Sequence, residues 1–93
     1  MRFDWDEAKN QHNIKKHGIS FERALTIFAA DIISTPDMRK NYGETRIRTI
    51  GVTNDDAVIV VAHTKRGATT RIISARAANR AERKYYEKTL KDT

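Results

Sequence analysis

The sequence predicts an α+β domain in which two helices come first, a group of strands follows and a basic helix comes last. Apolar residues at helical spacing occupy the first third of the chain, whereas three runs rich in β-branched residues, separated by short turn-prone segments, occupy the middle. Strands joined by such short turns pair as antiparallel neighbours. The expected architecture is therefore two N-terminal helices packed on a small antiparallel sheet, with the basic helix following it.

The N-terminal segment supplies both of the first helices. Asp4 or Asp6 can cap a helix that ends near Lys16, and Gly18 can close it. A second helix is expected to begin at Ser20, in SFERALTIFA, because its apolar residues fall at i, i+3, i+4 and i+7 and form one face. That face is expected to lie in the core.

The strands are expected at residues 46–53, 57–65 and 70–76. The middle run is apolar on both alternations, as in a central strand that is covered on both faces. Its two neighbours alternate isoleucine with arginine, so Arg46 and Arg48 should share one face of their strand. The three strands are therefore expected to form a meander with a cationic face.

The remaining segments are shorter. Residues 1–3 could form an edge strand, and residues 31–44 are irregular, although their isoleucine pair could anchor a short strand. Asn79 and Glu82 have the spacing of a capping box, so the last helix should begin directly after the asparagine and run toward Leu90. One domain accounts for the whole chain, residues 1–93.

Composition limits the class of partner. Eighteen Lys and Arg residues oppose twelve Asp and Glu, and the net charge of +6 is concentrated in residues 69–93. Such a field attracts RNA, DNA or an acidic protein surface. The absence of cysteine removes disulfides and thiolate metal sites, and the longest apolar run, residues 57–62, is too short to cross a bilayer. We therefore expect a soluble cytoplasmic protein without membrane contact.

Three segments resemble the BrnT family of type II toxins. They are FDWDEAKNQHNIKKHGISFERALTIF, GETRIRTIGV and RIISARAANRAERKYYE, and together they extend from Phe3 to Glu87. The resemblance implies a RelE-like fold and a ribonuclease that cleaves mRNA, either free or on the ribosome, and inhibits translation. It also implies a BrnA-like ribbon-helix-helix antitoxin as partner, with promoter DNA bound only through the antitoxin complex.

One segment departs from the family pattern. Many members carry a His-Ser pair before a Glu-x-Arg motif, which Glu44 to Arg46 match here, whereas this chain has KNYG at that place. If that histidine takes part in the chemistry elsewhere in the family, this chain manages without it. Tyr42 or Lys40 could take its place.

RNA cleavage without a metal needs a base for the 2′-hydroxyl, cations for the phosphate and an acid for the departing 5′-oxygen. His17 is a candidate acid or base because it is a histidine, the residue type that commonly serves that role, although a histidine at a helix end can equally serve the helix dipole. Glu44 could be the base or simply a solvated side chain. Arginine holds two phosphate oxygens and stays charged. The residues assigned to cleavage are His17, Glu44, Arg46, Arg76 and Arg80.

Further side chains are assigned to binding, each with an ordinary alternative. Those expected to contact RNA or its phosphates are Lys16, Arg71, Arg83 and Tyr86, although the tyrosine could instead be packing. Those assigned to the antitoxin are Lys84 and Lys88, which could equally be a solvated helix face. The two histidines nearest in sequence, His12 and His17, are five residues apart rather than four, so neither a metal nor another cofactor is expected.

Two other functions use the same residues. A basic RNA- or DNA-binding module without catalysis would employ the arginines only as phosphate contacts. An interaction domain would use the basic face to dock an acidic antitoxin segment. An acid or base group close to the arginines in the fold would favour the ribonuclease.

Overall fold

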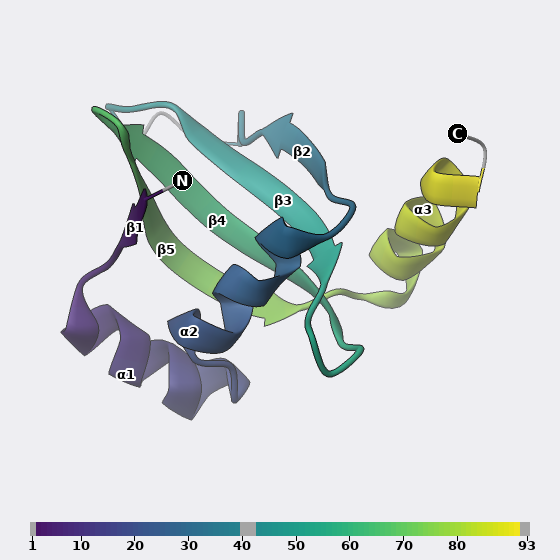
Figure 1. The fold of residues 1–93 in the computed structure, drawn as a ribbon, viewed down its shortest axis with the longest axis horizontal. Helices are drawn as coiled ribbons and strands as arrows, with labels where there is room; N and C mark the ends of the chain where they lie inside the picture. Colours follow the sequence, from purple (N-terminus) through teal and green to yellow (C-terminus); the bar gives the residue numbers. More distant parts are fainter. Residues whose placement is uncertain (1, 40–42, 92–93) are drawn as a thin grey trace.

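The computed structural model describes residues 2–39 and 43–91 and contains one five-stranded sheet, with the C-terminal helix set to one side of it (Figure 1). In chain order the elements are β1 (Arg2–Asp4), α1 (Glu7–His17), α2 (Phe21–Ala24), the 3₁₀ helix η1 (Leu25–Ala29), β2 (Ile33–Pro36), β3 (Arg46–Val52), β4 (Val58–Arg66), β5 (Thr69–Ala77) and α3 (Arg80–Lys91). The predicted α+β class and the three long strands are confirmed. The predicted fourth, short strand at the isoleucine pair is β2.

The sheet is mixed rather than antiparallel, which corrects the prediction. The strand order is β1-β5-β4-β3-β2, and β1 runs parallel to β5, with Phe3 opposite Thr70. The other neighbours are antiparallel. No hairpin turn joins β1 to β5, because the chain first passes through the helices and the other three strands. The antiparallel prediction came from the short turns between successive strands. Since no such turn connects β1 to β5, the sequence did not predict the direction of β1.

The two N-terminal helices differ in how well the sequence predicted them. Asp6, not Asp4, caps α1 by accepting hydrogen bonds from two backbone N–H groups, and Gly18 ends it with a φ of 71°. Ser20 caps α2, but regular helix ends at Ala24 and continues as η1. There the Thr26 hydroxyl donates to the Arg23 carbonyl, a bond that competes with regular helix geometry. The expected single helix is therefore two short ones.

The hydrophobic core lies between one face of the sheet and α2 with η1. Its largest fully buried side chains include Phe21, Ile27, Ile59 and Ile72. Gly51 on β3 lies directly beneath η1, where a Cβ atom would come within 2.8 Å of the Ile27 Cβ. This contact explains why glycine is needed inside a strand.

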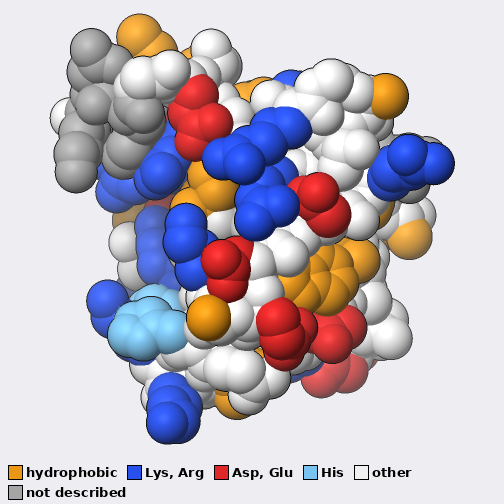
Figure 2. All heavy atoms as spheres, turned by 90° about the vertical axis from the view of Figure 1, so that its left-hand side faces the viewer, with side chains coloured by type: hydrophobic (Ala, Val, Ile, Leu, Met, Phe, Trp, Pro, Cys, Tyr) orange, Lys and Arg blue, Asp and Glu red, His pale blue; other side chains and the backbone are white. Residues whose placement is uncertain are grey.

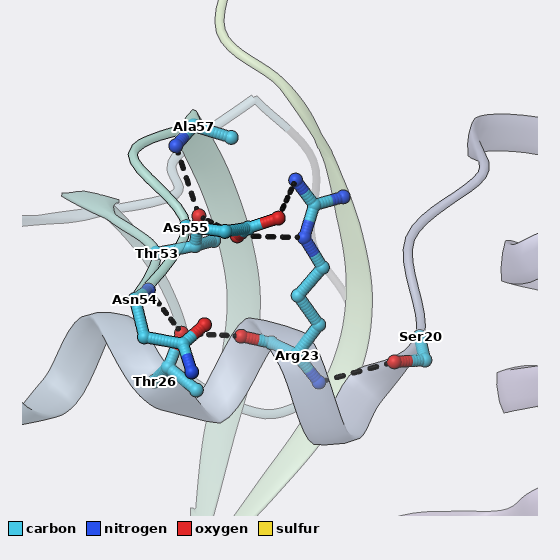
Figure 3. Close-up of polar contacts among 7 residues, drawn as sticks. All are labelled: Ser20, Arg23, Thr26, Thr53, Asn54, Asp55 and Ala57. Atoms are coloured by element: carbon cyan, nitrogen blue, oxygen red, sulfur yellow. Dashed lines mark hydrogen bonds and ion pairs between the residues drawn. The ribbon is translucent and has the colours of Figure 1, made fainter.

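A polar network fastens the turn between β3 and β4 to the helices (Figure 3). The Arg23 guanidinium pairs with the Asp55 carboxylate at 3.1 Å, and the Thr53 hydroxyl donates to the same carboxylate at 2.6 Å. The Asn54 backbone N–H donates to the Thr26 hydroxyl. This end of the hairpin is thus held by the helical side of the molecule, away from the opposite sheet face.

Asn13 joins α1 to the sheet. Its side-chain amide donates to the Ala75 carbonyl at 2.8 Å and accepts from the Ala75 N–H at 3.1 Å, as a neighbouring strand would. It also donates to the Ile19 carbonyl at 2.8 Å. Because β1 pairs with β5 only as far as Arg71, Asn13 satisfies backbone groups on a part of the β5 edge that β1 leaves uncovered.

A bulge in β5 sets which side chains face which side of the sheet. Ala62 pairs with Ser74 but His63 pairs with Ile72, so one residue of β5 has no partner on β4. Arg71 and Arg76 are five residues apart and would point to opposite faces of a regular strand. With the bulge between them, both lie on the face opposite the core.

His63 of β4 is buried on the core side of the sheet. Its exposed fraction is 7%, its Nε2 lies 2.7 Å from the Thr49 hydroxyl, and its ring meets the Phe28 ring edge to face. Its Nδ1 has no hydrogen-bond partner among the described residues. Burial lowers the pKa of His63 and so favours its neutral form in the folded protein.

Replacing Asn13 with alanine should lower the free energy of unfolding by about 3 kcal/mol, because buried backbone groups of Ala75 and Ile19 lose their partners. Chemical denaturation at neutral pH measures this. Gln11→Ala, an exposed change on the same helix, should stay within about 0.5 kcal/mol of the wild type. Equal effects from the two variants would contradict the role given to Asn13.

His63 should make stability depend on pH. The unfolded chain protonates this histidine near its ordinary pKa of about 6.5, whereas the folded chain resists protonation. Stability should therefore be constant above that pH and fall as the pH drops below it. Denaturation at pH 7.5 and 5.5 tests this: His63→Gln should remove most of the slope, and His12→Ala, an exposed histidine, should keep it.

Candidate active site

Four arginines project from the sheet face opposite the core, here called the open face. The register places Arg46 and Arg71 on either side of Thr64 of β4. Arg48 lies beside Ala62, and Arg76 beside Val60, further along the same strand. Since cross-strand partners share a face, these side chains line one surface. The predicted common face of Arg46 and Arg48 follows from the same register.

Arg76 forms a two-pronged ion pair with Glu82 at the start of α3. Its Nη1 and Nη2 lie 2.8 and 2.9 Å from the two carboxylate oxygens. Hydrogen bonding to Arg76 lowers the pKa of Glu82 from 4.5 to about 2, and the same pairing raises the pKa of Arg76. Glu82 also accepts from the Asn79 N–H while Asn79 accepts from the Glu82 N–H, which confirms the predicted capping box.

A second ion pair lies near the first, just after β2. Arg39 Nε and Nη2 donate to the two oxygens of Asp37, each at 2.9 Å. Asp37 is 6% exposed, and its bonds to Arg39 hold the pKa of its carboxyl well below the usual range. The charge of Arg48 also acts on both Asp37 and Glu82 and lowers both pKa values. Three arginines and two carboxylates therefore form one cluster.

Between β3, β4 and α3 the open face is hollowed into a pocket of about 270 Å³. Its lining residues are Thr35, Arg48, Ile50, Val60, Glu82 and Tyr85. The Nε of Arg48 is buried and has no hydrogen-bond partner among the described residues. Arg48 was predicted only to share a face with Arg46, and its two-residue spacing from Arg46 was the sequence signal for a place in the site.

Glu44 lies at the other end of the open face. Its carboxylate oxygens are 4.0 Å from Arg46 Nε and 3.8 Å from Arg66 Nη2. Arg71, across β4 from Arg46, pairs with Asp4 at 3.4 Å. The structure therefore places the carboxylate of Glu44, the candidate base, beside Arg46 on the open face. The suggested substitutes for the family histidine, Lys40 and Tyr42, lie outside the described residues.

His17 and Lys16 do not join this group. Both are exposed in the last turn of α1, which packs against β5 on the other side of the molecule from the pocket. Within the described chain no ion pair or hydrogen bond connects His17 to an open-face arginine. The position at a basic helix C-terminus fits the alternative interpretation, a charge that complements the helix dipole.

The assigned residues of α3 separate by exposure. Tyr86 is 6% exposed and donates its hydroxyl to the Asp31 carbonyl at 2.7 Å, so it packs and cannot stack on a base. Tyr85 beside it is 50% exposed and lines the pocket. The outward-facing basic residues of this helix are Arg80, Arg83, Lys84 and Lys88. Of these, Arg80 at the first helical position is nearest in sequence to Arg76.

Charge on the side of the molecule that carries β1 and α1 is mixed. Figure 2 faces the side of the molecule that carries β1 and α1 and shows Lys and Arg side chains interleaved with Asp and Glu. Among the described residues there is no group of three or more His, Cys, Asp or Glu that could hold a metal ion. Within the same residues, no helix has the length and apolar character needed to cross a membrane.

A solved structure shares this fold. The chain is similar to the 1.1 Å crystal structure of the Brucella abortus ribonuclease toxin, BrnT, with a TM-score of 0.65 and 30% sequence identity. The match covers 86% of this chain and 99% of the other. The class that the fold and the cationic open face define is thus that of small ribonuclease toxins.

The family follows from the sequence itself. Residues 5–82 match the family described as "Ribonuclease toxin, BrnT, of type II toxin-antitoxin system". The chain belongs to the BrnT family, as the three matching segments implied. A search of curated proteins found no match.

Replacing Glu82 with glutamine should weaken the acid dependence of stability. The stabilisation from Glu82 is fully present above its ordinary pKa of 4.5 and is lost as the pH falls toward about 2. Unfolding free energies measured from pH 6 to pH 2.5 should therefore fall less steeply in this variant and start lower at pH 6. Glu87→Gln, an exposed change on the same helix, serves as the control and should reproduce the wild-type profile.

Proposed function

We propose that this chain is the toxin of a type II toxin-antitoxin system and acts as an endoribonuclease that cleaves mRNA and thereby inhibits translation. One observation carries the proposal: Arg46, Arg48, Arg71 and Arg76 converge on one open sheet face with Glu44 at its edge. Membership of a family of ribonuclease toxins supports it. The whole chain acts as a single domain of the RelE-like type.

The chemistry follows from these positions. Glu44 takes the proton of a 2′-hydroxyl, the 2′-oxygen attacks the adjacent phosphorus, and the bond to the 5′-oxygen breaks. Arg46 and Arg71 stabilise the negative charge that gathers on the phosphorus-bound oxygens. The departing 5′-oxygen takes a proton from water. The products are a 2′,3′-cyclic phosphate and a free 5′-hydroxyl.

The arginines would supply the charge stabilisation that a metal ion supplies in other nucleases, and we therefore propose a reaction without a metal or other cofactor. His17 and Arg80 remain outside this scheme because neither contacts the Glu44 end of the open face in the described structure. Arg76 acts by holding Glu82 and the start of α3.

The partner proposed is a BrnA-like ribbon-helix-helix antitoxin. The exposed basic side of α3, with Arg83, Lys84 and Lys88, offers a docking surface for an acidic segment, and promoter DNA would be bound only through the complex. The toxin would meet mRNA in the cytoplasm. Its family supports an antitoxin partner and an RNA substrate; the rest is our proposal.

The decisive experiment compares two variants that remove the same charge. Arg46→Ala with Arg71→Ala should reduce cleavage of a purified transcript by at least about 100-fold, because both phosphate contacts are lost. Lys9→Ala with Lys15→Ala, on exposed positions of α1, should cleave like the wild type. Circular dichroism establishes that both variants are folded, and an excess of EDTA should leave wild-type cleavage unchanged.

The same variants expressed without antitoxin test the toxin function. Wild type and the lysine variant should arrest growth and shorten transcripts, and the arginine variant should not. A wild-type protein that binds RNA but leaves it intact would favour the non-catalytic binding module. A fully active arginine variant would refute the assignment of the open face.

A further inference from the structure

The pocket on the open face combines groups that suit a planar base. Ile50 and Val60 form an apolar floor, and the exposed ring of Tyr85 forms a wall. Arg48 brings donors only, and Glu82 brings acceptors only. The volume of about 270 Å³ is just below the range of about 300–1,000 Å³ typical of sites for drug-sized ligands, which fits one base with part of its sugar.

The charges disfavour a phosphate in this pocket. Arg76 and Arg39 each donate two hydrogen bonds to a carboxylate. Arg48 is therefore the arginine of this cluster that can donate to a ligand in the pocket. The Glu82 carboxylate on the pocket wall would repel an anion. A neutral ligand with both acceptors and donors on its edges would instead satisfy both groups.

Glu82 retains capacity for one more donor. A carboxylate has about four acceptor positions. Arg76 uses two of them and the Asn79 N–H uses one. The remaining position can accept from a ligand inside the pocket. The Thr35 hydroxyl at the rim can donate or accept as the ligand requires.

We propose that this pocket recognises a guanine base of the RNA next to the cleaved phosphate. The guanine O6 and N7 accept from Arg48, its N1–H or 2-amino group donates to Glu82, and its ring stacks on Tyr85. Adenine carries an amino donor where Arg48 requires an acceptor, and pyrimidines stack over a smaller area. Arg48 lies two residues from Arg46, about 7 Å along the strand, so base recognition adjoins the proposed cleavage chemistry.

This inference rests on the proposed function but is tested without cleavage. The four nucleoside 5′-monophosphates, which carry the same phosphate, are titrated into the protein made by cell-free synthesis and followed by NMR chemical shifts. The guanosine nucleotide should bind about tenfold more tightly than the other three. Inorganic phosphate should shift neither Tyr85 nor Ile50.

Variants separate the two contacts. Arg48→Lys keeps the charge but loses the planar fork, so the preference for guanosine should fall to near unity. Tyr85→Ala should weaken all four nucleotides by a similar factor of about five or more, whereas Tyr85→Phe should not. Arg2→Lys, an exposed arginine on β1, is the matched control and should retain the preference.

Equal affinity for the four nucleotides, or an unchanged preference in Arg48→Lys, would overturn the proposal, as would the absence of any binding at millimolar concentration. RNA cleavage is assayed on the same samples. Guanosine selectivity without cleavage would refute the proposed function and leave the pocket assignment intact. Cleavage without selectivity would refute only the pocket.

Discussion

The arrangement depends on how β5 is held along the edge that faces away from β4. Its N-terminal part pairs with β1, and further along the Asn13 amide takes the place of a strand by bonding both polar groups of Ala75. Because a buried, unpaired edge would be costly, this substitution lets β1 end early and lets α1 approach the sheet. The segments α2 and η1 cover the core face of the sheet, and the arginines occupy the other face, beside the start of α3.

The bulge in β5 then assigns the side chains to these faces. Ile72 and Ala75, three residues apart, are both buried in the core, while Arg71 and Arg76 both face the opposite side. A regular strand could not serve both requirements, since it would turn one member of each pair to the wrong face. The irregularity therefore makes the hydrophobic core and the cationic open face compatible within one strand.

Much of the fold could be predicted from local patterns. Gly18, the capping box of Asn79 with Glu82 and the alternation of arginine in β3 are signals that act within a few residues, and each was confirmed. The direction of β1 and the bulge in β5 depend on contacts between distant segments, which no local pattern encodes. The resemblance to the BrnT family indicated the class of protein without any prediction of these long-range contacts.

In the candidate site, too, local sequence patterns predicted some features and long-range structure determined the others. Arg46 and Arg48 could be grouped because residues two apart on a strand share a face, but the role of Arg48 became apparent only from the pocket. Tyr86 and His17 were attractive by residue type alone. Tyr86 is buried and so cannot stack on a base, and His17 lies at the end of α1, away from the open face. Neither burial nor position in the fold can be inferred from a single helical turn.

The ion pair between Arg76 and Glu82 links the ordering of a helix to the charge of a site. The carboxylate that fixes where α3 begins is also the one that holds Arg76 and lines the pocket. A change at either position alone would leave a partly buried charge without its partner and displace the first turn of the helix. Descendants of this sequence should therefore alter the two residues together or not at all, so that they are inherited as a pair.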